Sequence, residues 1–187
     1  EQKRILSDLN YGISIMFKIT DVSSSLSSGV ICIFMTTNYK SIKVIPIKLL
    51  MHINSTKEEV FKALTESDKL SKWYTTIVKG VFKLDEIITF EFINFAEFKF
   101  KVIAITQNES VHLEIVESEF DNVGHIMKYD LDENDGKTRV SFTYEGFGEM
   151  DDSYANMNYS SAKYLESLRQ YCQTGNGEAF GSPSYRS

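Results

Sequence analysis

The sequence predicts an α+β fold in which a curved antiparallel sheet of about seven strands wraps round one long C-terminal helix. Two observations lead to this prediction. Apolar and polar side chains alternate over most of residues 81–147, as in antiparallel strands with one buried face. Residues 151–174 instead repeat apolar side chains at three- and four-residue steps, as in an amphipathic helix. A curved sheet cannot bury its concave face alone, and only this helix is large enough to cover it.

The segment before the alternating region predicts one strand followed by two short helices. Residues 45–53 (IPIKLLMHI) form the predicted strand. Ser55 followed by Glu58 fits a capping box, in which each side chain satisfies a free backbone amide at the start of the first helix. Asp68 is the expected N-terminal cap of the second helix. The side chains expected on the apolar sides of these helices are Val60, Phe61, Leu64, Leu70, Trp73 and Tyr74.

The alternating region divides into strands at turn-forming residues. The predicted breaks are Gln107-Asn108, Asp121-Asn122 and the NDG sequence at residues 134–136. Between these breaks, every second side chain is assigned to the buried face. These inward side chains include Ile88, Phe90, Phe92, Phe98, Phe100, Val102, Ala104, Val111, Leu113, Ile115, His125, Met127, Tyr129, Leu131, Val140, Phe142 and Tyr144.

The long helix at residues 151–174 carries signals at both ends. Glu149, Asp151 and Asp152 stand at or just before its start, and negative charge there complements the helix dipole. We interpret this acidic cluster as capping rather than metal binding. Gly175 stands where a glycine commonly ends a helix.

A sheet wrapped round one helix tends to leave a cavity between the two, and the pattern of inward side chains predicts its lining. Polar tips among apolar walls are typical of pockets that orient a ligand. A shift of one residue along a strand would reverse these faces. The predicted cavity-lining residues are Trp73, Phe90, Phe92, Phe98, Phe100, His125, Met127, Tyr129, Phe142, Tyr144, Tyr154, Met157, Ser161, Tyr164, Leu165 and Leu168.

The composition excludes several classes of protein. The chain has 187 residues and a formal net charge of -6, which argues against a nucleic-acid partner because such proteins need a basic face. No apolar stretch approaches the roughly 20 residues of a membrane helix, so no membrane partner is expected. Two cysteines do not make a disulfide framework, so we expect a cytoplasmic protein.

The sequence divides into three parts. Residues 1–43 are an N-terminal extension of unknown role, with two short apolar runs separated by a serine-rich segment. Residues 44–180 are the expected folded domain. Residues 181–187 are small and polar and are expected to form a flexible tail.

The residue types that carry catalysis or bind metals are sparse. Cys172 falls on the apolar face of the last helix and is interpreted as a core thiol. The three histidines lack the spacing of a zinc site, so no metal and no cofactor are predicted. The run DLDENDGK at residues 130–137 has Ser141 where a calcium loop needs glutamate, and a hairpin turn explains it better. No catalytic residue is assigned.

Three segments resemble the START-like (SRPBCC) superfamily, whose members have the helix-grip fold. These segments are INSTKEEVFKALTESDKLSKWY at residues 53–74, KTRVSFTYEGFG at residues 137–148 and YLESLRQYCQTGNGEAF at residues 164–180. Within the superfamily the chain is most similar to the branch named after the activator of the ninety-kilodalton heat-shock ATPase. Asp85-Glu86 departs from the paired glycines that this branch often has after the tryptophan helix. The resemblance implies a helix-grip domain over residues 45–180.

Three functions remain open on this resemblance, because the superfamily includes ligand carriers, co-chaperones and polyketide cyclases. The first is the binding of a hydrophobic or aromatic small molecule between sheet and helix, by a monomer or homodimer. The second is a protein-binding, co-chaperone-like module that acts on an ATPase. The third is a cyclase- or aromatase-like enzyme, in which His125 would polarise a carbonyl.

Overall fold

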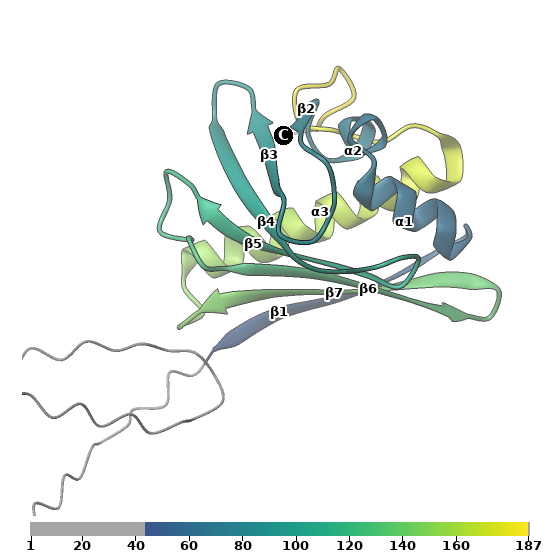
Figure 1. Ribbon diagram of the computed structural model, residues 1–187, viewed down its shortest axis with the longest axis horizontal. Helices are drawn as coiled ribbons and strands as arrows, with labels where there is room; N and C mark the ends of the chain where they lie inside the picture. The colour runs from purple at the N-terminus through teal and green to yellow at the C-terminus, as the bar shows by residue number, and fades with distance from the viewer. Residues whose placement is uncertain (1–43, 187) are drawn as a thin grey trace, which may run out of the picture. The chain divides into compact units, whose positions relative to one another are not determined.

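The computed structural model of the protein describes residues 44–186, which form one antiparallel sheet and three helices (Figure 1). The predicted N-terminal extension, residues 1–43, lies outside the described residues, as does Ser187. The elements are β1 (Ile45–Ile53), α1 (Lys57–Thr65), α2 (Ser67–Trp73), β2 (Ile77–Lys79), β3 (Ile87–Phe92), β4 (Ala96–Thr106), β5 (Ser110–Glu117), β6 (Ile126–Asn134), β7 (Lys137–Phe147) and α3 (Asp152–Thr174). The predicted curved seven-stranded sheet with a long C-terminal helix, the helix-grip fold, is confirmed.

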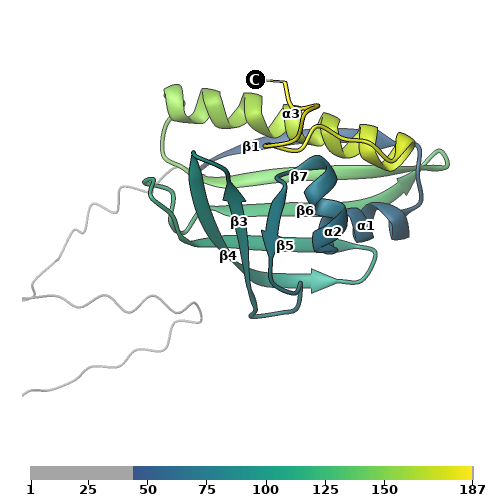
Figure 2. The ribbon, with the colours of Figure 1, turned by 90° about the horizontal axis from the view of Figure 1, so that it is seen from above.

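The sheet is a meander that β1 extends at one edge. The strand order is β1-β7-β6-β5-β4-β3-β2, so β2 to β7 follow one another and β1 pairs with β7 (Figure 2). α3 lies along the concave side, and α1 and α2 lie beside its C-terminal half in both views. No helix among residues 44–186 combines the length and the hydropathy needed to cross a membrane.

α3 begins and ends where its sequence signals lie. The carboxylate Oδ1 of Asp151 accepts a hydrogen bond from the backbone amide of Tyr154 at 2.8 Å, which confirms its predicted capping role. Gly175 ends the helix with φ of 78°, a left-handed conformation that glycine adopts without steric cost. The side chains that α3 buries are Ser161, Leu165, Ser167 and Leu168.

Trp73 fastens α2 to its neighbours. Its indole Nε1 donates a hydrogen bond to the carbonyl oxygen of Ala63 at 2.8 Å. Its own carbonyl oxygen accepts a hydrogen bond from the hydroxyl of Ser167 on α3 at 2.7 Å. The Ser167 oxygen in turn accepts from the backbone amide of Glu178, also at 2.7 Å. One buried tryptophan and one buried serine therefore tie together α1, α2, α3 and the chain that follows α3.

Both predicted caps of the short helices are wrong by one or two residues. Thr56, not Ser55, caps α1, because its hydroxyl accepts from the amide of Glu59 at 3.2 Å. The amide of Ser55 instead donates to the carbonyl of Ile53 in the preceding turn. α2 follows α1 so closely that Glu66 is both the C-cap of α1 and the N-cap of α2, which leaves Asp68 in the first turn.

One predicted inward position is also wrong, because β4 contains a bulge. The register with β5 shifts between Val102 and Ala104, so the alternation of faces changes phase there. Ala104 now stands opposite His112, whose ring bonds Asp130 on the outer face at 2.9 Å. Ile105 packs against the core instead.

Residues 181–186, expected to form part of a flexible tail, make specific contacts. The ring of Tyr185 lies 4.9 Å from the ring of Phe180, measured between centroids. The ammonium group of Lys163 lies 3.8 Å from the centroid of the Tyr185 ring. Arg186 donates to the carboxylate of Glu178 through its Nε at 2.8 Å. This segment therefore lies against α3 and the chain just before it.

Candidate ligand-binding cavity

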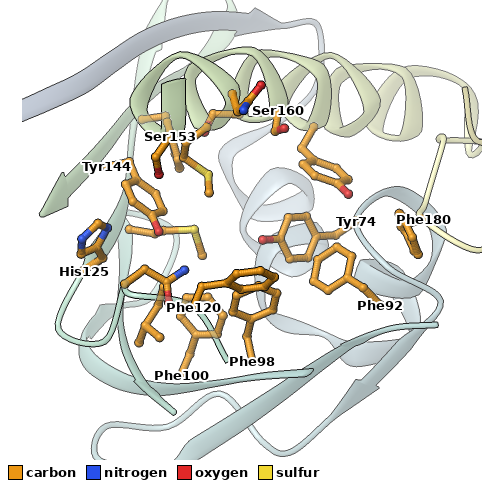
Figure 3. A pocket seen from close by; sticks show the side chains of 18 of the residues that line it. Tyr74, Phe92, Phe98, Phe100, Phe120, His125, Tyr144, Ser153, Ser160 and Phe180 are labelled. Carbon is orange, nitrogen blue, oxygen red and sulfur yellow. The ribbon is translucent and has the colours of Figure 1, made fainter. Parts of the chain in front are cut away.

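A cavity of about 760 Å³ lies between the concave face of the sheet and the N-terminal half of α3. Figure 3 shows the rings of Phe98, Phe100 and Phe120 on the sheet side and Ser153 and Ser160 on the helix side. Loops as well as regular elements contribute to the wall. The cavity is therefore formed where α3 passes over the curved sheet without filling it.

Most of the predicted lining residues are brought together in this cavity. They come from β3, β4, β6, β7 and α3, and from the residue just before β6. Their shared feature is an inward position in the alternation of a strand or on the apolar face of α3. The predicted residues that line the cavity are Phe92, Phe98, Phe100, His125, Met127, Tyr129, Phe142, Tyr144, Met157, Ser161 and Tyr164.

The other predicted residues point inward but lie away from the cavity wall. Trp73 is buried between α1, α2 and α3, where it makes the hydrogen bonds described above. Phe90 is also buried, and its ring centroid lies 5.1 Å from that of Tyr74. Leu165 and Leu168 are buried in the core under the C-terminal half of α3. Tyr154 packs edge-on against Phe147, with 5.2 Å between ring centroids.

The structure adds lining residues that were not predicted to line the cavity. Phe95 and Phe120 come from the turn between β3 and β4 and from the loop between β5 and β6, where alternation carries no information. The sequence pattern places Tyr74 on the apolar side of its helix but does not predict it in the cavity. The added lining residues are Tyr74, Phe95, Ile115, Phe120, Asp121, Asn122, Phe147, Ser153, Asn156, Ser160, Phe180 and Tyr185.

Tyr74 occupies a central place in the aromatic part of the wall. Its ring centroid lies 4.7 Å from that of Tyr164 and 5.6 Å from that of Phe92, both in edge-to-face geometry. Its hydroxyl points toward the middle of the cavity (Figure 3). Burial raises the pKa of Tyr74 well above its ordinary value, so its hydroxyl stays protonated at neutral pH. It can donate or accept a hydrogen bond but carries no charge.

Phe180 closes one side of the cavity from the chain after α3. Its backbone amide donates to the carbonyl of Tyr74 at 2.9 Å, and its carbonyl accepts from the amide of Thr76 at 3.0 Å. These bonds fix Phe180 beside the end of α2, where its ring lies 5.3 Å from that of Phe92. Phe180 and the neighbouring Tyr185 are therefore part of the cavity wall.

His125 stands at the opposite end, among aromatic rings. Its ring centroid lies 4.9 Å from that of Phe147 and 5.6 Å from that of Tyr144. Its Nδ1 is buried without a hydrogen-bond partner among the described residues. Burial lowers the pKa of His125, although the carboxylate of Asp121 opposes that shift, so the imidazole is neutral at pH 7.

The position of His125 depends on Gly146. Gly146 has φ of 134°, and a β-carbon built there would overlap the imidazole ring of His125. The register between β1 and β7 also shifts near this residue, between Ile45 and Ile47. The absence of a side chain at residue 146 therefore leaves the space that the imidazole occupies.

Two kinds of chemistry considered from the sequence are a metal site and a reactive thiol. No three His, Cys, Asp or Glu side chains of residues 44–186 gather as a metal site would require. Cys172 packs against the core, and burial raises the pKa of its thiol to about 12. A thiol with such a pKa is protonated at neutral pH and is a weak nucleophile.

Comparison with solved structures gives the same fold in several proteins. The Aha1 protein of Colwellia psychrerythraea, solved as a dimer, is 27% identical, with a TM-score of 0.67 over 71% of this chain and 99% of that one. DynU16, from the dynemicin biosynthetic locus, is 12% identical, with a TM-score of 0.67 over 75% of this chain and 51% of that one. SSP2350 of Staphylococcus saprophyticus is 17% identical, with a TM-score of 0.62 over 71% and 95% of the two chains.

Sequence comparison identifies the family. A search of curated protein sequences found no significant match. The model of the family described as Activator of Hsp90 ATPase homolog 1-like protein matches residues 54–173, which run from the turn before α1 almost to the end of α3. The resemblance stated from the sequence is thereby confirmed, and the chain belongs to the Activator of Hsp90 ATPase homolog 1-like family.

Proposed function

We propose that this protein binds a hydrophobic or aromatic small molecule in the cavity between the sheet and α3. The observation that carries the proposal is the cavity itself, about 760 Å³ in volume and walled mainly by aromatic side chains. Ligand pockets in proteins commonly measure roughly 300–1,000 Å³ and combine apolar walls with a few polar groups. Tyr74 and Ser160 supply such polar groups here.

Packing energetics support a ligand rather than an incompletely filled core. Protein interiors are close-packed, and the side chains around an empty space lose the van der Waals contacts that they would otherwise make. The other end of the same helix shows that this chain can fill the space under α3, since Leu165 and Leu168 are buried there. A ligand would restore those contacts at the open end.

The proposal is one of binding and assigns no catalytic step. The buried tyrosines Tyr129 and Tyr144 have raised pKa values because of burial, so neither is an acid or base near neutral pH. His125 Nδ1 has no partner among residues 44–186 that would hold the imidazole as a base. The proposal keeps the cytoplasmic location that cysteine usage predicted.

Native mass spectrometry of the freshly purified protein, compared with its denatured mass, tests this function. We expect a native mass that exceeds the denatured mass by one small molecule per chain, which solvent extraction would then release for identification. The same spectrum counts the subunits and so distinguishes a monomer from a homodimer. A native mass without added ligand, together with no binding of any aromatic probe, would contradict the proposal.

A filled cavity provides the matched test of position. Met157 lines the cavity from α3, so Met157→Trp should reduce ligand binding at least about tenfold while the protein stays folded. Tyr159 lies two residues away and is 71% exposed, so Tyr159→Trp adds the same indole on the outer face and should leave binding unchanged. Equal affinity in both variants would show that the ligand binds elsewhere.

A second candidate function is a protein-binding accessory of an ATPase. The family description and the 27% identity to the Colwellia protein support it. Exposed aromatic side chains at Phe95 and Phe120 offer a surface for such contact, being 61% and 44% exposed. The test is the steady-state ATPase rate of the ninety-kilodalton heat-shock protein with and without this protein, with Phe95→Ser as the variant expected to lose any stimulation.

A further inference from the structure

The cavity wall contains no lysine and no arginine among the described residues. Its only carboxylate is that of Asp121, and its only imidazole is that of His125. All other polar groups that face the cavity are hydroxyls or amides, which carry no charge at neutral pH. The wall therefore offers hydrogen bonds but no positive charge.

The lysines near the cavity are directed elsewhere by the alternation of the strands. Lys99 and Lys128 lie on the outer face of the sheet, where they pair with Glu117 and Glu145 at 2.7 Å. Lys163 is next to the lining residue Tyr164, but its ammonium group lies over the ring of Tyr185. Lys99 and Lys128 are thus held by carboxylates on the outer face, and Lys163 is not among the residues that line the cavity.

The start of α3 does not supply a positive site either. The first amides of a helix attract anions, and Ser153 of this first turn lines the cavity. Asp151 already accepts the hydrogen bond of the Tyr154 amide, and Asp152 adds a second negative charge. Asp121 adds a negative charge in the wall itself.

We propose that this cavity binds uncharged aromatic molecules in preference to their anionic analogues. An anion that entered would lose its hydration, and it would find no cation to replace it. A neutral flat ring meets aromatic faces, such as those of Phe98 and Phe120, which stack with 5.7 Å between centroids. This inference rests on the proposed binding function and narrows the class of ligand, disfavouring fatty acids, aromatic carboxylates and phosphate esters.

A matched pair of fluorescent probes tests the preference on the full chain. N-phenyl-1-naphthylamine and 1-anilinonaphthalene-8-sulfonate share one ring skeleton and differ by the sulfonate. At pH 7.5 we expect the uncharged probe to bind at least about tenfold more tightly. The sulfonate also makes the probe less hydrophobic, so a difference in affinity alone does not isolate the effect of charge. The ratio of the two affinities is therefore measured again in a variant that adds a positive charge to the cavity.

Ser160→Lys supplies the missing charge, since Ser160 points into the cavity from α3 (Figure 3). We expect it to strengthen sulfonate binding about tenfold relative to the uncharged probe. The control is Ala162→Lys, which places the same charge on an exposed position of the same helix and should leave the ratio unchanged.

The possible results separate the two proposals. Equal or tighter binding of the sulfonate by the wild-type protein would overturn the charge preference and leave the binding function standing. An unchanged ratio in Ser160→Lys would show that the missing cation is not the cause, which also overturns the inference. If neither probe binds and none displaces a co-purified ligand, the proposed function itself fails.

Discussion

The two halves of α3 face the same sheet but meet it differently. The C-terminal half is packed, with Leu168 fully buried and Ser167 bonded to the backbone of Trp73. The N-terminal half presents Ser153, Met157 and Ser160 to a cavity of about 760 Å³. One helix therefore serves as a core element at one end and as the wall of a pocket at the other.

The difference has two physical causes. α1 and α2 lie beside the C-terminal half of α3, and Trp73 of α2 fills the space there, whereas no helix of residues 44–186 lies beside the N-terminal half (Figure 1). The side chains that α3 directs into the cavity are also short or unbranched, mostly serine, asparagine and methionine. The size of the side chains on α3 and the position of α1 and α2 therefore produce the cavity at one end of the helix, although the same sheet lies under both ends.

The largest expected effect comes from truncating one side chain in each half. Leu168→Ala should lower the free energy of unfolding by about 3 kcal/mol, because it leaves a cavity in a close-packed region. Met157→Ala should cost about 1 kcal/mol or less, since Met157 is half-buried and already borders open space. Urea unfolding measures both. Equal losses would mean that the two ends of α3 are packed alike.

The next effect should come from Gly146, which gives His125 its place at the open end. Gly146→Ala introduces a β-carbon into the imidazole and forces alanine into positive φ, so we expect a loss of about 2 kcal/mol. Gly148→Ala is the control, because a β-carbon there meets nothing within 4 Å. Thermal unfolding of both variants measures the difference. If the two variants are equally stable, the ring of His125 does not depend on this glycine.

A smaller effect is expected at the cap that holds the open half of α3. Asp151→Ala removes the acceptor of the Tyr154 amide and should cost about 1 kcal/mol in unfolding free energy. Asp152→Ala removes a charge of the same sign but no cap hydrogen bond, so it should cost less. Urea unfolding at two salt concentrations separates the screened charge effect from the hydrogen bond. A larger loss in Asp152→Ala would contradict the assignment of the cap.

The smallest effect is the pH dependence that His125 contributes. Because burial lowers its pKa in the folded protein below the ordinary 6.5, the unfolded chain binds the proton more readily. Its stabilising contribution is therefore complete above pH 6.5 and declines as the pH falls through the lowered pKa. His125→Gln should flatten the fall in urea midpoint between pH 7.5 and pH 5.5. An equally steep fall in that variant would assign the effect to other groups.

Periodicity predicted which face of each element is buried but not how far along it the cavity extends. Phe90, Leu165 and Leu168 are inward as predicted, yet they lie in the packed half, where other side chains cover them. Position along an element depends on which distant segments pack beside it. The two-residue period of a strand and the 3.6-residue period of a helix indicate which face is buried, but they do not indicate which segments pack beside it.

Three other features could not be predicted from the sequence. These are the cap of α1, the bulge in β4 and the lining residues that lie in connections. Ser55 and Thr56 each precede a glutamate by three residues, so either could cap the helix. The amide of Ser55 bonds the carbonyl of Ile53 in the preceding turn, and the helix is capped by Thr56. The bulge in β4 reverses the alternation after Val102 without any glycine to announce it. Phe95 and Phe120 belong to connections, where the spacing of apolar residues does not predict which side chains line a cavity.

The backbone bonds of Phe180 also have a consequence for protein synthesis. Phe180 pairs with Tyr74 and Thr76, more than a hundred residues earlier, and its ring completes a wall to which β3, β6 and β7 also contribute. A ribosome must therefore release the chain beyond Tyr185 before every wall of the pocket can assemble.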